Sequence, residues 1–175
     1  MEGATSISIV VHLAKKSTGI VGTKMNASKR EPFNWEHYVD GQIDCIIEDF
    51  LYLSDLEGLE TMHQLGITHV VSLLSDCTII EHPIENHLRL CVFDDEKQSL
   101  VHIFPVVFAY LDKCKENNHK VLVHCSAGIS RSPAVVIAYL MHSKGMTIQE
   151  AYNHVWERRR VIYPNEGFMK QLNCL

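Results

Sequence analysis

The chain has 175 residues, 46% of them hydrophobic and 21% charged, so it can form one domain with a short appendage, and wholesale disorder is excluded. Sixteen Lys and Arg stand against 21 Asp and Glu. The net charge of -5 excludes a general basic field that would attract nucleic acid or acidic membranes. Any anion that the protein handles must therefore be bound locally.

The chain start and the cysteines bear on location and cofactors. The longest apolar run, 134–141, is far shorter than the ~18 to 20 residues that cross a bilayer. Glu2 stands where a signal peptide carries positive charge and excludes myristoylation, so we expect a cytoplasmic protein, with a nuclear location also open. The cysteines form no C-x-x-C pair, which predicts reduced thiols and no disulfide framework, metal site or cofactor. They are Cys45, Cys77, Cys91, Cys114, Cys125 and Cys174.

The elements follow a short extension. Residues 1–42 mix Ser, Thr, Gly and Lys, and we expect them to be loosely structured and to precede one domain at 43–175. In that domain, β-rich runs alternate with helix-length amphipathic segments. Strands are predicted at 44–53, 68–74, 88–93 and 120–124, and helices at 55–65, 100–117, 130–144, 147–159 and 165–175. The alternation predicts an α/β fold, with a central, mostly parallel sheet of four to five strands and helices on both faces.

The segment that carries chemistry follows the last predicted strand. His124 and Cys125 come first, then five residues, then Arg131 at the start of a helix. The backbone N–H groups of this turn can surround one tetrahedral oxyanion, and Gly128 permits the tight conformation. The helix start adds a positive dipole end, and the same field favours the thiolate form of Cys125, a candidate nucleophile. The residues expected to bind the anion are Ser126, Ala127, Gly128, Ile129, Ser130 and Arg131.

The other groups that phosphoryl transfer needs are also present. The planar guanidinium of Arg131 can bind two phosphate oxygens at once and stays charged at any physiological pH. The leaving oxygen needs a proton, and Asp94 and Asp95 follow the predicted strand at 88–93. Because neighbouring parallel strands end at the same edge of a sheet, either carboxyl group can reach the Cys125 loop.

These residues resemble those of a known enzyme family. The stretch 124–132, HCSAGISRS, matches the phosphate-loop signature of small dual-specificity protein phosphatases in the cysteine-dependent tyrosine phosphatase superfamily. Further matches at 50–56, 65–71 and 164–172 extend the resemblance over about three quarters of the chain. Cys91, Arg160 and Ser72 depart from the usual pattern, in which Pro, Pro and Asn are common.

The resemblance implies a role for each site residue. Cys125 is the nucleophile, Arg131 binds phosphate and Asp94, rather than Asp95, is the general acid. Ser132 helps the thiolate to leave during hydrolysis. Asn165 braces the loop. From its position we expect His124 either to support the loop or to tune the ionisation of Cys125, rather than to act as a base. The implied activity is hydrolysis of phosphotyrosine and of phosphoserine or phosphothreonine in proteins, with signalling kinases as one class of substrate.

Two other classes of protein share parts of this pattern. A phosphatase-like module could bind phosphoproteins with little turnover, although all the catalytic groups are present. Another thiol enzyme, such as a sulfurtransferase or an arsenate reductase, is disfavoured by the Cys-to-Arg spacing and by its late position in the chain. The physiological substrate, the recruiting partner and the oligomeric state stay open.

Overall fold

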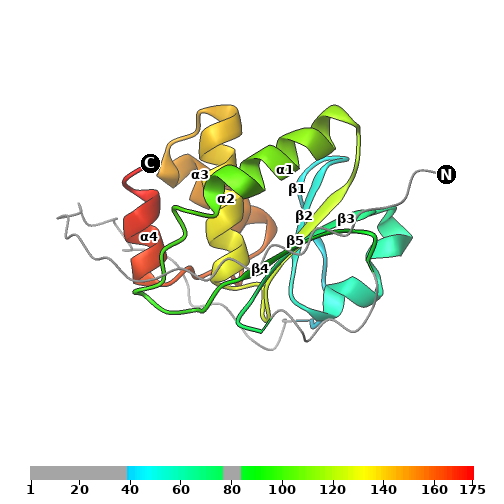
Figure 1. Ribbon diagram of the computed structural model, residues 1–175, viewed down its shortest axis with the longest axis horizontal. Helices are drawn as coiled ribbons and strands as arrows, with labels where there is room; N and C mark the ends of the chain where they lie inside the picture. Colours follow the sequence, from blue (N-terminus) through cyan, green and yellow to red (C-terminus); the bar gives the residue numbers. More distant parts are fainter. Residues whose placement is uncertain (1–38, 77–83) are drawn as a thin grey trace.

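A computed structural model describes residues 39–76 and 84–175, and the proposed extension lies outside the described residues up to position 38. The described chain forms a five-stranded sheet in the order β1-β2-β5-β3-β4, in which only β1 is antiparallel (Figure 1). The prediction of a mostly parallel α/β sheet is therefore confirmed. The strands are β1 (Asp44–Ile47), β2 (Leu51–Ser54), β3 (His69–Leu74), β4 (Asn86–Cys91) and β5 (Val121–His124).

The run predicted as one strand at 44–53 is wrong in detail, because it folds back on itself as β1 and β2. Asp49 takes a left-handed conformation with φ of 54°, and the Phe50 amide donates to the Ile47 carbonyl at 3.1 Å. Asp tolerates this conformation better than most residues, so it permits the tight turn. The sequence alone does not reveal this turn, because the apolar residues on either side of it fit one long strand as well as the two strands of a hairpin.

One face of the sheet is covered by all four α-helices of the described chain. The central α2 (Arg131–Lys144) is buried along its first ten residues and packs on β2, β3 and β5 and against the other three helices. Thr147 and Glu150 form the capping box predicted at the start of α3. The other three helices are α1 (Phe104–Glu116), α3 (Ile148–Arg158) and α4 (Glu166–Leu172).

The opposite face carries much shorter helices. The predicted helix at 55–65 is instead two 3₁₀ helices, η2 (Glu57–Glu60) and η3 (Met62–Leu65). Thr61 separates them, and Gly66 ends the second with φ of 71°. Alternate strand residues face this smaller core, which contains Tyr52, Ile67, Val70 and Leu122. Within the described residues, no helix is long and apolar enough to cross a membrane.

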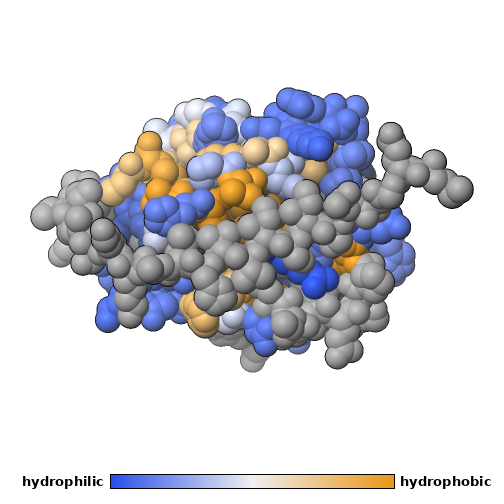
Figure 2. Space-filling view, viewed as in Figure 1, coloured by the Kyte–Doolittle hydropathy of each residue, from blue (hydrophilic) through white to orange (hydrophobic). Residues whose placement is uncertain are grey.

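The sheet direction determines which loops meet. β2, β3, β4 and β5 run parallel, so the segments that follow them emerge at the same edge. The turn at 125–130 and the segment at 92–99 therefore approach each other. In the view of Figure 2, hydrophilic residues cover the end of α1, and hydrophobic residues gather nearer the middle of that face.

Candidate active site

The turn between β5 and α2 is held from outside by its carbonyl groups. Each carbonyl oxygen of residues 126–129 accepts a hydrogen bond from a donor that lies outside the turn. In a trans peptide the N–H group points away from the C=O group, so the N–H groups of 127–130 point to the opposite, inner side. The donors are Leu56 N to Ser126 O (3.2 Å), Arg159 Nη2 to Ala127 O (3.4 Å), Arg159 Nε to Gly128 O (3.0 Å) and Tyr163 N to Ile129 O (2.7 Å).

Gly128 is required by both its conformation and its surroundings. Its φ is +63°, in the left-handed region that favours glycine. A Cβ atom there would lie 2.5 Å from the Ser54 carbonyl oxygen and 2.6 Å from Arg159 Nη2. Any larger residue would push the loop away from both neighbours, so the turn keeps its converging N–H groups only with glycine at this place.

Cys125 lies at the base of this turn. The residue is buried, with 2% of its surface exposed. The Ser132 hydroxyl, in the first turn of α2, donates a hydrogen bond to Cys125 Sγ at 3.1 Å. A hydroxyl in this position stabilises negative charge on the sulfur, both before attack and when the thiolate is the leaving group.

Arg131 is buried beside the turn and is fixed from two directions. Nη1 donates to Ser75 Oγ and to the Val92 carbonyl, both at 3.2 Å, and Nη2 donates to Ser126 Oγ at 3.0 Å. Nε makes no hydrogen bond to any described residue, and Asp94 Oδ2 lies 3.9 Å from it. The guanidinium group of Arg131 is therefore held in one orientation, and its buried Nε–H can still donate a hydrogen bond to an anion.

The structure separates the two adjacent aspartates. Asp94 Oδ1 accepts hydrogen bonds from Ser130 Oγ at 2.7 Å and from Asn165 Nδ2 at 2.8 Å, so this carboxylate lies against the anion-binding turn. Asp95 Oδ1 accepts from the Lys97 amide at 2.7 Å and stabilises its own turn. Asn165 also caps α4, since its Oδ1 accepts from the Phe168 amide.

Helix α4 positions the segment that carries Asp94. Gln171 accepts from the Leu100 amide at 2.7 Å and donates to the Gln98 carbonyl at 2.8 Å. Gly167 lies so close to the Glu96 backbone that a Cβ atom would overlap with it. The closing helix thus determines how near the acidic segment comes to the turn, a role that no local pattern in the sequence indicates.

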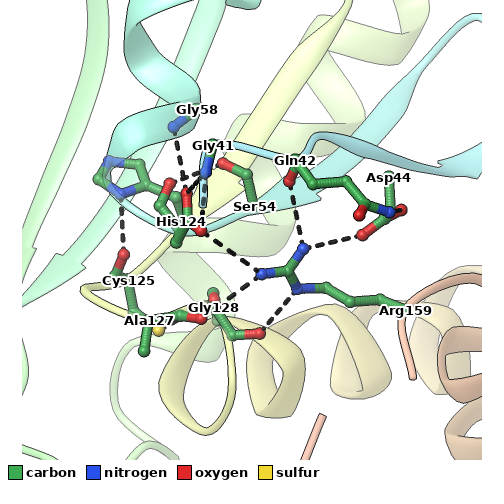
Figure 3. A network of polar contacts seen from close by, with 12 residues as sticks. Gly41, Gln42, Asp44, Ser54, Gly58, His124, Cys125, Ala127, Gly128 and Arg159 are labelled. Carbon is green, nitrogen blue, oxygen red and sulfur yellow. Dashed lines mark hydrogen bonds and ion pairs between the residues drawn. The ribbon is translucent and has the colours of Figure 1, made fainter. Parts of the chain in front are cut away.

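A buried ion network around Arg159 supports the turn (Figure 3). Arg159 Nη1 donates to Asp44 Oδ2 at 2.8 Å and to the Gln42 carbonyl at 3.2 Å, and Nη2 lies 4.0 Å from Asp55 Oδ2. Sequence reasoning missed this role, because in the run 158–160 three arginines at a helix end look alike. Only Arg159 of the three is buried.

Loss of Arg159 should weaken the fold and the site together. We expect Arg159→Met to lower the free energy of unfolding by about 3 to 5 kcal/mol, because Asp44 and Asp55 lose their compensating cation. The matched control Arg158→Met removes an exposed neighbour and should change it by less than about 0.5 kcal/mol. Urea denaturation measures both. Equal effects of the two changes would contradict the assignment, and Asp44→Asn tests the same ion pair if Arg159→Met does not fold.

A chain of hydrogen bonds leads from the sheet to the nucleophile. Arg89 Nε donates to His87 Nδ1 at 3.0 Å, and Ser72 Oγ lies 2.6 Å from His87 Nε2 and 2.5 Å from His124 Nε2. His124 Nδ1 is 3.2 Å from the Cys125 carbonyl oxygen. One arrangement of protons satisfies every contact. His87 donates to Ser72, Ser72 donates to His124 and His124 donates to the carbonyl, with both imidazoles neutral.

This neutrality should make stability depend on pH. Burial lowers the pKa of His124 to about 4. Burial, together with the positive charge of neighbouring Arg89, lowers the pKa of His87 to about 3. The unfolded chain binds these protons near pH 6.5, so stability should fall as the pH drops below about 6.5, by about 1 kcal/mol per pH unit for each of the two histidines. Urea denaturation at about pH 7 and pH 5 measures this.

The variant His87→Gln removes one of the buried histidines with a lowered pKa and should show a shallower fall. His63→Gln, which changes an exposed histidine, should behave like the wild type. A wild-type stability that is flat across this pH range, or equal slopes for the wild type and His87→Gln, would contradict the prediction.

Comparison with known proteins agrees with this geometry. Residues 50–175 match the family model described as "Dual specificity phosphatase, catalytic domain". The chain is 37% identical over 130 residues to a probable rhodanese domain-containing dual specificity protein phosphatase of Dictyostelium discoideum, covering 73% of this chain and 27% of that protein. It is 34% identical to dual specificity protein phosphatase 1 of Arabidopsis thaliana, and the match covers 79% of this chain and 71% of that protein. The chain belongs to the dual-specificity phosphatase family.

Solved structures show the same fold. Human tyrosine phosphatase-like serine/threonine/tyrosine-interacting protein has a TM-score of 0.69 with 32% identity, over 74% of this chain and 92% of that one. Human DUSP28 has a TM-score of 0.70 with 29% identity, over 75% of this chain and 90% of that one. Several curated relatives are longer proteins, of which this chain spans 13 to 27%.

Proposed function

We propose that this chain is an active protein phosphatase that hydrolyses phosphotyrosine and phosphoserine or phosphothreonine through a cysteinyl-phosphate. One observation carries the proposal. Cys125 Sγ, with a hydroxyl donor at 3.1 Å, shares one edge of the sheet with the oriented guanidinium of Arg131 and with the carboxylate of Asp94. These are the nucleophile, the anion ligand and the acid that phosphoryl transfer onto sulfur requires.

The first step transfers the phosphoryl group to the protein. The Cys125 thiolate attacks phosphorus, and the bond from phosphorus to the substrate oxygen breaks. The N–H groups of the turn and the Nε–H of Arg131 stabilise the negative charge of the equatorial oxygens in the transition state. The protonated carboxyl group of Asp94 gives its proton to the leaving oxygen and becomes a carboxylate.

The second step restores the thiolate. Asp94 accepts a proton from a water molecule as that water attacks phosphorus, and the sulfur–phosphorus bond breaks. Ser132 donates its hydrogen bond to the departing sulfur, and inorganic phosphate is released. The acid and base roles of Asp94 therefore alternate within one turnover.

The proposed dual specificity is supported by an open rim. Phe93 is 55% exposed and Tyr163 is 74% exposed, and both lie next to segments of the site. Ser126 and Ala127 are exposed as well, whereas Cys125 is buried just beneath them. Since deep walls would cover these residues, we infer a shallow pocket in which the short stem of phosphothreonine also reaches the thiolate.

A test compares two peptides of one sequence that carry phosphate on Tyr or on Thr. We expect phosphate release from both, faster from the phosphotyrosine peptide because a phenol is the better leaving group. Release from neither would favour the alternative of a phosphoprotein-binding module, which the name of the human phosphatase-like relative suggests. Release from phosphotyrosine alone, with every phosphothreonine peptide resistant, would overturn the dual specificity.

The remaining features of the proposal concern the whole protein. We infer that residues 43–175 form the catalytic domain, that 1–42 are an extension without catalytic groups and that the substrate is a cytoplasmic phosphoprotein, with signalling kinases as one class. The assigned catalytic side chains lie between Asp94 and Ser132, which supports this division.

A further inference from the structure

A second cluster of reactive side chains lies at the other edge of the sheet. His69 is the first residue of β3, Cys114 is close to the end of α1, and His119 lies between α1 and β5. His69 is paired with Val121, the first residue of β5, whereas Cys125 follows the last residue of that strand. The four residues of β5, about 13 Å long, therefore separate this cluster from the catalytic thiol.

We propose that His69, Cys114 and His119 bind a Zn²⁺ ion. Among the described residues, one ligand atom of each of these three side chains lies within 4.8 Å of the other two. Two imidazoles and a thiolate suit zinc, and water can complete the tetrahedron. Mg²⁺ and Ca²⁺ prefer oxygen ligands, which this set lacks.

The three side chains are near one another, and binding zinc requires their ligand atoms to move closer together. Zn–N bonds of ~2.0 to 2.1 Å and a Zn–S bond of ~2.3 Å need ligand atoms roughly 3.3 to 3.7 Å apart at tetrahedral angles. The rings of His69 and His119 stack with centroids 4.2 Å apart and planes 17° apart. The His119 amide donates to the Cys114 carbonyl at 2.9 Å, so its backbone is already held beside the thiol. In stacked rings the in-plane nitrogen lone pairs run nearly parallel, so the His119 ring must turn about its side-chain bonds to direct its lone pair at the ion.

A neighbouring hydroxyl group orients one of the two imidazoles. Thr68 Oγ1 lies 2.9 Å from His69 Nδ1; in the tautomer in which Nδ1–H donates a hydrogen bond to this hydroxyl, the Nε2 lone pair is left for the metal. On binding, Zn²⁺ forms a bond to Sγ, and the thiol proton goes to solvent.

An ion can reach this position from solvent. His119 lies at the surface, and the residues from Lys115 to Asn118 at the end of α1 are exposed. Figure 2 shows hydrophilic residues over this end of α1. The ion would tie α1 to β3 across the N-terminal edge of the sheet, so the site would serve stability rather than catalysis.

The test uses the full chain in a Cys125→Ser background, which removes the catalytic thiol as a competing ligand. Co²⁺ is the probe because a cysteine ligand produces a thiolate-to-cobalt absorption band and tetrahedral sites absorb in the visible range. We expect one Co²⁺ per chain, displaced by Zn²⁺ with a dissociation constant of about 1 µM or below. We also expect Zn²⁺ at a concentration of about a hundred times this dissociation constant to raise the Tm of the protein by about 5 °C or more.

Two second-site changes test the ligands. His119→Gln alters a partly exposed residue and keeps the fold, and Cys114→Ala removes the thiolate. Both should abolish the cobalt spectrum and the Zn²⁺-dependent rise in Tm, whereas Cys174→Ser, at an exposed cysteine, should change neither. Absence of saturable Co²⁺ binding in the Cys125→Ser protein would overturn the site. Retention of the full spectrum in His119→Gln or in Cys114→Ala would also overturn it.

Discussion

Cys125→Ser should lower kcat/KM for an aryl phosphate by at least about 10⁴-fold, while phosphopeptide binding stays within about tenfold of the wild type. Turnover is lost because a serine hydroxyl in this turn is a far weaker nucleophile than a thiolate. Binding persists because the N–H groups of the turn and the fork of Arg131 do not depend on the sulfur. Steady-state kinetics and calorimetric titration with a phosphotyrosine peptide measure the two quantities.

Cys174→Ser is the matched control, since it makes the same atomic change at an exposed cysteine and should leave the rate unchanged. Wild-type turnover in Cys125→Ser would contradict the covalent mechanism. Loss of binding together with turnover would show instead that the sulfur is needed to hold the turn in shape.

Asp94→Asn should slow hydrolysis of substrates with poor leaving groups by about 10² to 10⁴-fold. The amide has nearly the shape of the carboxyl group and can still accept from Ser130 and Asn165, but it has no proton to give to the leaving oxygen. Substrates whose leaving group needs no proton should react at nearly the wild-type rate. A series of aryl phosphates with leaving groups of graded acidity measures this dependence.

Asp95→Asn is the neighbouring control. The side-chain amide that this change introduces could still accept from the Lys97 amide, so the turn should persist and the rate should change little for every leaving group. If Asp95→Asn shows the leaving-group dependence and Asp94→Asn does not, the acid is the second aspartate of the pair. Dependence in neither variant would mean that the proton comes from another group.

The residues of the anion-binding turn were predictable because their signal is local. Cys125, Gly128 and Arg131 lie within seven consecutive positions between an apolar run and a helix, and a turn of that length has few ways to close. The capping box at Thr147 was predictable for the same reason, since it depends on residues three apart. The choice between Asp94 and Asp95 was not of this kind, because both follow the same strand.

Contacts between distant segments could not be read from any pattern. The nearest carboxylate of Arg159 belongs to Asp44, 115 positions earlier, and nothing local distinguishes Arg159 from Arg158. Ser72 looks like an ordinary strand residue until parallel pairing brings its hydroxyl between His87 and His124. In each case, a neighbouring strand or helix supplies the partner.

The order of residues was enough to specify the class of fold, the family resemblance and the residues that can perform the chemistry, because periodicity and short motifs are encoded by near neighbours. Packing in three dimensions determined which arginine is buried, which aspartate faces the turn and that His69, Cys114 and His119 meet at the far edge of the sheet. The physical reason is that burial and the pairing of charges depend on contacts between segments, and the order of residues along one segment does not specify its partners.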